Sequence, residues 1–193
     1  MFWLLQSFSL TACHSSRFVA IDKYTIKMQD YYSGGDSSYH FAFVKPTALG
    51  VDGCYTFSLC ATAHNWDYIA VGFSSAIEQL DASIDDDFWC DCAYVVLGGQ
   101  LRYGIGHDAP KVNDDDCLGR VPCSGDIITL LYNPDNGTLS AAFNLAPAIL
   151  LRVDIPKIQF DKLRFFVALQ DGGEEEELLS VTLVSNPRSS YRK

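Results

Sequence analysis

Cysteine spacing suggests the first chemistry that this chain could perform. Cys90 and Cys92 stand two positions apart on an expected strand, so their side chains share one face. Cys117 and Cys123 flank a later loop, and His107 lies between the two pairs. Four thiolates, or three and an imidazole, satisfy the tetrahedral geometry of Zn²⁺. The spacing differs from the usual zinc patterns, so we expect free cysteines buried as small apolar residues, ahead of a metal site or a disulfide between Cys117 and Cys123.

Two runs of aspartate raise the question of calcium. Residues 85–87 and 114–116 could supply carboxylate oxygens, which Ca²⁺ prefers as ligands. Neither run has the spaced acids and the turn glycine of an EF-hand loop. We therefore expect solvated loop acids, and the sequence predicts neither a metal nor another cofactor.

Motifs for nucleophilic or phosphate chemistry are missing. Residues 72–76 lack the final glycine of G-x-S-x-G, and the chain contains neither a phosphate-binding loop nor H-E-x-x-H. The four histidines are scattered along the chain: His14, His40, His64 and His107. The residues therefore show no catalytic constellation, and we do not expect an enzyme.

Net charge narrows the choice of partner. The chain has 193 residues, with 14 Lys and Arg against 24 Asp and Glu, so its formal charge is −10. This balance argues against a nucleic-acid binder, which needs clustered basic side chains to neutralise phosphates. Residues 81–126 hold ten acids and three bases, or −7 of the total, which favours a basic partner.

The elements that must position these residues are short strands. Runs rich in Val, Ile, Phe, Tyr and Thr are separated by Gly, Asp, Asn and Pro, and helical periodicity is scarce. After Cys54, Phe57 and Leu59 fall on one face and Ser58 on the other, which predicts a half-buried strand. Further strands are expected at residues 17–22, 24–29, 39–44, 68–73, 89–97, 100–104, 163–169 and 178–184.

One hairpin is predicted with particular clarity. Residues 127–132 are apolar on both faces, as expected for a strand inside a sandwich. Residues 133–137, Asn-Pro-Asp-Asn-Gly, combine a proline with an Asn-Gly pair that tolerates positive φ, so they predict a turn. Residues 138–143 then form the return strand. The whole pattern predicts one all-β domain, an antiparallel β-sandwich.

Residues 124–144 carry a family resemblance. This stretch is similar to the Gly-Asp, strand, turn and "TLsF" hairpin of SPRY (B30.2-like) domains. Weaker similarity covers the opening strands, the glycine-rich centre and the closing strands, at residues 50–59, 67–74, 96–99, 103–106, 163–169 and 177–179. Tyr55-Thr-Phe-Ser replaces the aromatic and acidic pattern of tripartite-motif domains, and Asn144-Leu replaces their Asn-Gly, so the subfamily stays open.

The resemblance implies a concanavalin-type jelly roll at residues 17–184. Residues 1–16 are then an N-terminal segment, disordered or helical, and residues 185–193 a flexible basic tail. The resemblance also implies a non-catalytic module that binds a protein or peptide through loops at one end. Such a module could be the substrate-recognition part of a ubiquitin ligase or a signalling adaptor.

Loop aromatics and the acids beside them are the candidate partner-binding residues, because Trp and Tyr dominate binding hot spots. They are Tyr31, Tyr32, Trp66, Tyr68, Asp85, Asp86, Asp87, Phe88, Trp89, Asp114, Asp115 and Asp116. For each aromatic side chain, burial in the core is the competing expectation.

A second family resemblance supplies an alternative to the SPRY interpretation. Residues 68–74 with the Asp-rich sequence after them also resemble DOMON domains, β-sandwiches that bind haem or sugars outside the cell. Haem would then be held by Met28 and a histidine. This alternative predicts secretion and a glycan on Asn136, the acceptor of an Asn-Gly-Thr sequon.

Cysteine number bears on the compartment. Seven is an odd number, which disfavours a disulfide framework, so we expect a reduced, cytoplasmic protein. The apolar start of the chain lacks the basic residues that open most signal peptides, although a signal peptide there is the alternative. No apolar run approaches the roughly 20 residues that span a bilayer.

Overall fold

The computed structural model describes the strands of this chain and several of the segments that join them. The described residues are 8–9, 18–20, 24–28, 39–44, 53–62, 69–74, 88–89, 94–97, 100–102, 104–105, 123–152, 155, 157–159, 161–170 and 180–184. Every element among them is a β-strand, and all strand pairs are antiparallel. In this part of the chain no helix is long and apolar enough to cross a membrane.

The larger sheet has seven strands and contains the predicted hairpin. β11 (Ile127–Asn133) pairs with β12 (Thr138–Phe143) on one side and with β5 (Tyr55–Thr62) on the other. The sheet order is β13-β12-β11-β5-β15-β3-β2. Its remaining strands are β13 (Ile149–Arg152), β15 (Ser180–Leu183), β3 (Thr25–Met28) and β2 (Phe18–Ala20). β11 therefore lies inside a sheet, which confirms the prediction made from its two apolar faces.

The smaller sheet has six strands, in the order β1-β4-β14-β6-β8-β9. β14 (Arg164–Gln170) pairs with both β4 (Tyr39–Val44) and β6 (Ile69–Ser74). The outer strands are β1 (Phe8–Ser9), β8 (Tyr94–Leu97) and β9 (Gln100–Arg102). A separate two-stranded ladder joins β7 (Phe88–Trp89) to β10 (Gly104–Ile105).

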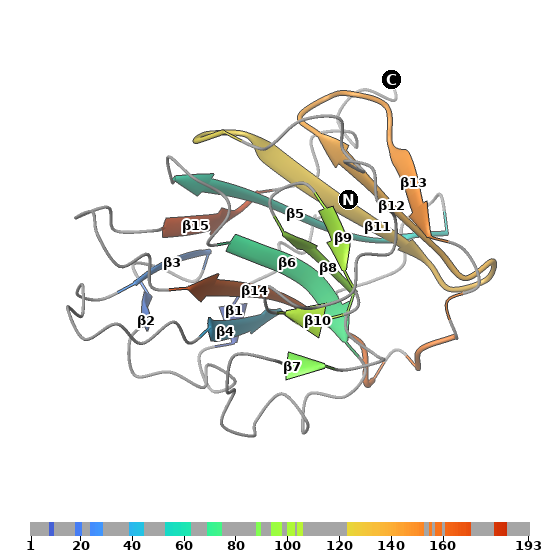
Figure 1. Cartoon of the computed structure of the whole chain (residues 1–193), viewed down its shortest axis with the longest axis horizontal. Coiled ribbons are helices and arrows are strands. Elements are labelled where there is room, and N and C mark those ends of the chain that lie inside the picture. Colours follow the sequence, from blue (N-terminus) through green and yellow to red (C-terminus); the bar gives the residue numbers. More distant parts are fainter. Residues whose placement is uncertain are drawn as a thin grey trace, which may run out of the picture.

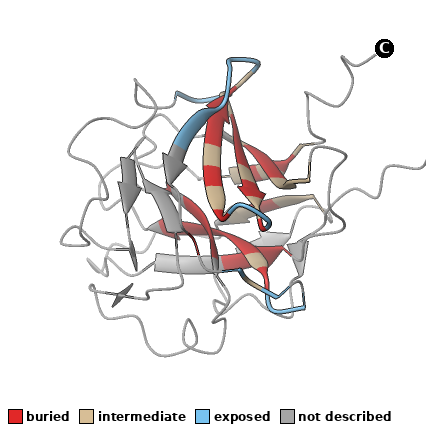
Figure 2. Ribbon diagram, turned by 90° about the vertical axis from the view of Figure 1, so that its right-hand side faces the viewer, coloured by how far each residue is buried: buried red, intermediate tan, exposed pale blue. Residues whose placement is uncertain are grey.

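The hydrophobic core lies between the two sheets, which pack face to face (Figure 1). Phe57 of the larger sheet stacks on Phe165 of the smaller sheet, with ring centroids 5.0 Å apart. Tyr132 stacks in the same way on Phe73, at 4.8 Å. Buried residues run along strands of both sheets in Figure 2, where they are red. The predicted antiparallel β-sandwich is confirmed.

Ser58 is a residue whose burial could not be predicted from the alternation of polar and apolar residues along its strand. Phe57 and Leu59 are buried in the core, as predicted for their face of β5. Ser58 falls on the opposite face, yet it is only 3% exposed. Its hydroxyl shares a 2.9 Å hydrogen bond with that of Thr129, the residue opposite it on β11. The hydrogen bond compensates the two hydroxyls for the loss of water.

Several strand boundaries differ from those expected. Residues 89–97 were predicted as one strand, but β7 and β8 pair with different neighbours, β10 and β6. Residues 100–104 are likewise divided between β9 and β10. Two further strands, β1 and β13, were not predicted. β1 lies within residues 1–16 and pairs with β4, so at least this piece of the N-terminal segment is a strand.

Candidate functional site

The register of the strands defines two ends of the sandwich. One is the Gly137 end, which carries the turn of the β11–β12 hairpin, the start of β5 and the end of β6. The other is the Asn144 end, where β5 ends, β6 begins and β12 leads into Asn144. The stacking of Tyr132 on Phe73 aligns the two sheets, since both residues lie close to the Gly137 end. Loops that leave from one of these ends can contribute to one binding surface.

At the Gly137 end, side-chain hydrogen bonds shape the hairpin turn. The Asn133 Oδ1 atom accepts hydrogen bonds from the backbone N–H groups of Asp135 and Asn136, at 2.9 and 3.2 Å. Gly137 has φ = 62°, in the left-handed region that favours glycine. Thr138 donates its hydroxyl proton to Asn136 Oδ1 at 2.6 Å, so the two polar residues of the sequon contact each other on the surface.

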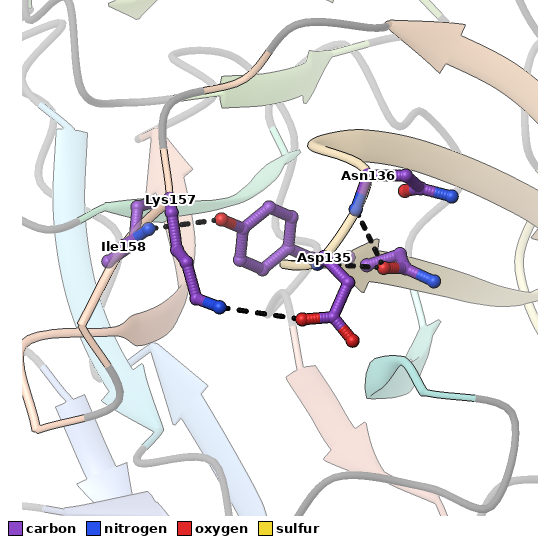
Figure 3. A network of polar contacts seen from close by, with 6 residues as sticks. Asp135, Asn136, Lys157 and Ile158 are labelled. Carbon is purple, nitrogen blue, oxygen red and sulfur yellow. Dashed lines mark hydrogen bonds and ion pairs between the residues drawn. The ribbon is translucent and has the colours of Figure 1, made fainter.

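Ile155, Lys157 and Ile158 pack against this turn. The Ile155 N–H donates to the Gly137 carbonyl at 2.9 Å, and the Ile158 N–H donates to the Tyr132 hydroxyl at 3.1 Å. Lys157 forms an exposed ion pair with Asp135 at 3.4 Å. Figure 3 shows Lys157 and Ile158 beside the turn. Burial raises the pKa of Tyr132, and the Ile158 N–H and the charge of Lys157 partly oppose that rise.

At the Asn144 end, one asparagine joins the ends of β11 and β12. Asn144 has φ = 47°, which asparagine tolerates better than most residues. Its Oδ1 atom accepts from the Ile127 N–H, and its Nδ2 group donates to Asp126 Oδ1, both at 2.9 Å. Asp126 Oδ2 accepts from the Cys123 N–H at 2.8 Å. These hydrogen bonds fix the start of β11 and the end of β12 relative to each other.

One described cysteine, Cys60, does not have the character of a reactive thiol. Burial, followed by the charge of Asp126, raises the pKa of the Cys60 thiol above its ordinary value. A raised pKa keeps this side chain protonated, and the thiolate is the form that attacks substrates and binds metals. The Cys60 thiol is free. Cys123 is exposed, so the expected burial of the cysteines is wrong at this position.

An exposed apolar surface follows β12. Leu145, Ile149 and Leu150 are 60%, 43% and 56% exposed, and the structure describes no other large hydrophobic side chain as exposed. We call these three residues the apolar edge. The stretch from the turn after β12 into β13 is the pale blue ribbon at the top of Figure 2. Isolated exposed leucines are ordinary, but three exposed aliphatic side chains within six positions are a local concentration of apolar surface.

The apolar edge lies in a stretch of sequence that is visibly apolar and uncharged, although it was not selected as a candidate site. Residues 145–151 read Leu-Ala-Pro-Ala-Ile-Leu-Leu and contain no charge. They were not predicted as a strand, and no binding role was expected of them. The candidate residues were chosen from aromatic and acidic side chains, whereas the described structure exposes aliphatic ones.

Most of the predicted partner-binding residues lie outside the described residues. These are Tyr31, Tyr32, Trp66, Tyr68, Asp85, Asp86, Asp87, Asp114, Asp115 and Asp116. Phe88 and Trp89 form β7 and pair with β10, and the structure describes their backbone alone.

The strands that flank these candidate segments show to which end of the sandwich each segment is attached. β3 and β4 flank the segment with Tyr31 and Tyr32, and β5 and β6 flank the segment with Trp66 and Tyr68. The register puts the end of β3, the start of β4, the end of β5 and the start of β6 at the Asn144 end. The chain before Asp85 instead leaves β6 at the Gly137 end. The candidate segments are therefore not all attached to the same end.

The metal and haem hypotheses depend largely on residues that the structure does not describe. Cys90, Cys92, Cys117 and His107 lie outside the described residues, and so do the Asp runs considered for calcium. Within the part that is described, no three His, Cys, Asp or Glu side chains are grouped closely enough to hold a metal ion. Met28 ends β3, but its side chain is not among those described.

Comparison with solved structures identifies the fold. The chain is similar to the SPRY domain of human HERC1, with a TM-score of 0.62 and 13% identity, over 93% of this chain and 98% of that one. It is also similar to the TRIM65 PSpry domain, with a TM-score of 0.56 and 12% identity over 94% and 93%. A human SPRY domain gives 0.55 and 18% identity over 87% and 94%. No protein-family model and no curated protein matches the sequence.

These likenesses cover nearly the whole chain and concern its β-sandwich. The fold is therefore that of a SPRY domain, as the hairpin at residues 124–144 implied.

Proposed function

We propose that this SPRY-type β-sandwich is a non-catalytic protein-interaction domain that binds a peptide or protein through loops at one end. The observation that carries the proposal is the likeness to SPRY domains over 93% of the chain. The net charge of −10 favours a basic partner, because opposite charge steers encounter. The proposal includes a cytoplasmic protein that serves as the substrate-recognition part of a ubiquitin ligase or as a signalling adaptor.

The Asn144 end is the better candidate for the aromatic part of this site. Tyr31, Tyr32, Trp66 and Tyr68 belong to two segments whose flanking strands terminate at that end. Aromatic side chains on loops held by a rigid scaffold are common binding anchors. The hydrogen bonds of Asn144 supply such a scaffold. We assign the anchoring role to these four aromatics and a longer-range steering role to the aspartates, since the chain before Asp85 leaves β6 at the Gly137 end.

Quantitative affinity capture tests the anchoring role. The wild-type chain is compared with a Tyr31→Ala, Trp66→Ala double variant, and captured proteins are identified by mass spectrometry. We expect at least one specific partner, whose recovery falls tenfold or more with the double variant, since hot-spot aromatics each contribute about 2 kcal/mol or more. Lys162→Ala is the control, because Lys162 is exposed on the turn before β14. A partner recovered equally with all three proteins would contradict the proposed site. Failure to capture any specific partner would contradict the proposed function.

Charge neutralisation tests the steering role. An Asp85→Asn, Asp86→Asn, Asp87→Asn variant should bind the same partner more weakly at low salt, through slower association. The difference should shrink as salt rises, because a Debye length of about 8 Å at 0.15 M screens exposed charges. Unchanged association at low salt would show that these aspartates do not steer the partner.

A further inference from the structure

The outer side of β13 is the edge of the larger sheet. β12 pairs with one side of β13, and among the described strands none pairs with the other. An unpaired edge presents backbone N–H and C=O groups that can pair with another chain. Natural proteins usually protect such an edge with charged side chains. Residues 145–151 contain no charge, and Arg152 stands only at the end of the strand.

Two side chains of β13, those of Ile149 and Leu150, are also available. Ile149 and Leu150 are adjacent on the strand, so they point to opposite faces of the sheet. Both are exposed, and neither belongs to the core cluster between the sheets. β13 therefore offers apolar contacts on two faces, and Leu145 extends them along the preceding turn. Covering these side chains would remove apolar surface from water, which is favourable.

We propose that β13 is a second binding surface, on which an extended segment of a partner protein adds one strand to the larger sheet. Backbone hydrogen bonds to β13 hold the segment, and its alternate apolar side chains cover Ile149 and Leu150. Basic residues flank the apolar ones, because the domain as a whole carries a charge of −10.

Two observations favour a peptide segment over a second copy of this chain. The exposed strand has four residues and the apolar edge three side chains, whereas a stable protein interface buries roughly 800 Å² on each partner. Two copies would also bring together two domains of charge −10, which repel each other. A short strand from another protein needs little area, because the backbone of β13 supplies much of the contact.

Synthetic peptides test the proposal directly. The probes are labelled nine-residue peptides with valine or isoleucine at alternate positions, threonine between them and lysine or arginine at both ends. Scrambled peptides of the same composition are the controls, since they keep charge and hydrophobicity but lose the alternation. We expect the alternating peptides to bind at least tenfold more tightly than the scrambled ones. Hydrogen exchange should slow on binding at those β13 amides that point away from β12, as it does when an edge becomes paired.

Two charge-matched variants locate the binding surface. Leu150→Lys adds a charge on β13, and Gln159→Lys adds the same charge at an exposed position outside the strand. Leu150→Lys should weaken peptide binding tenfold or more, and Gln159→Lys should change it less than twofold. The proposal is overturned if the two variants weaken binding equally, or if no alternating peptide binds better than its scrambled control. A wild-type dimer that Leu150→Lys dissociates in sedimentation would also overturn it, in favour of a second copy.

This surface is independent of the proposed loop site. A Trp66→Ala variant should bind the alternating peptides as the wild type does. The loop proposal can therefore fail while the β13 proposal stands, and the reverse is equally true.

Discussion

Tyr132 combines a buried ring with a satisfied hydroxyl. The residue is 0% exposed, and its ring stacks on Phe73 across the core. Its hydroxyl oxygen accepts the hydrogen bond of the Ile158 N–H, so a group far along the chain is tied to β11. Tyrosine can hold this segment where phenylalanine could not, since only tyrosine brings a polar atom to the end of the buried ring.

Tyr132→Phe should destabilise the domain by about 1–2 kcal/mol, because the Ile158 N–H would lose its partner while the ring packing stays intact. Urea unfolding measures the change. Lys157→Met is the control, since the Lys157 and Asp135 side chains are 71% and 74% exposed and such pairs stabilise little. Equal effects of the two substitutions would contradict the role of the hydroxyl.

The same residue predicts a pH dependence. Burial raises the pKa of Tyr132 above 10.0, so the folded state favours the neutral phenol more than the unfolded state does. The folded state then binds more protons between the two pKa values, and stability falls as pH rises above about 10. Unfolding midpoints from pH 8 to 11 should fall less steeply in Tyr132→Phe than in the wild type. Parallel curves would show that this phenol does not contribute.

At the scale of elements, the β11–β12 hairpin depends on its turn glycine for two reasons. Gly137 has φ = 62°, and a Cβ atom there would lie 2.6 Å from the Ile155 carbonyl oxygen. Glycine is thus required both by the backbone conformation and by the close approach of residue 155. The second reason was invisible in the sequence, because residues 137 and 155 meet only in the folded chain.

Gly125 allows the two reasons to be separated. It has φ = 85°, but a Cβ atom there would meet nothing within 4 Å. Gly125→Ala should therefore cost only the left-handed conformation, about 1–2 kcal/mol. Gly137→Ala should cost clearly more, about 3 kcal/mol or above, because the backbone of Ile155 must also move. Denaturant unfolding of both variants checks this order, and equal costs would mean that the contact with Ile155 is unimportant.

At the scale of the whole molecule, aromatic contacts hold the two sheets together. Phe165 of β14 is fully buried, stacks on Phe57 of β5 and meets Phe73 edge-on. Phe57 and Phe165 are more than 100 residues apart in sequence, so this part of the core forms only when the sheets meet. The interface between the sheets therefore determines the stability of the domain.

Phe165→Ala should cost about 3–5 kcal/mol, because it leaves a cavity between the sheets. That is a large part of the roughly 5–15 kcal/mol by which domains are stable. Leu145→Ala is the control and should change stability by less than about 0.5 kcal/mol, since Leu145 is 60% exposed. Thermal unfolding followed by circular dichroism measures both, and a small effect of Phe165→Ala would contradict the central place of this ring.

Local patterns predicted the hairpin best. The apolar run of β11, the Asn-Pro-Asp-Asn-Gly turn and the return strand β12 all agree with the structure. Local patterns failed for β13, whose three consecutive aliphatic residues show no alternation, and for Ser58, whose polar side chain is buried. Both failures concern what surrounds a strand, and a strand's own residues do not contain that information.

The sequence by itself determined the strands, the turn chemistry and the acidic character, because backbone conformation and side-chain periodicity act over a few neighbouring residues. It also carried the SPRY resemblance, through the hairpin at residues 124–144. Tertiary structure alone decided which strand ends share the Asn144 end and which strand lies at the edge of the larger sheet. The hydrogen bond between Ser58 and Thr129 joins positions 71 residues apart. Such pairings depend on the packing of the complete chain, and they left Ile149 and Leu150 of β13 exposed.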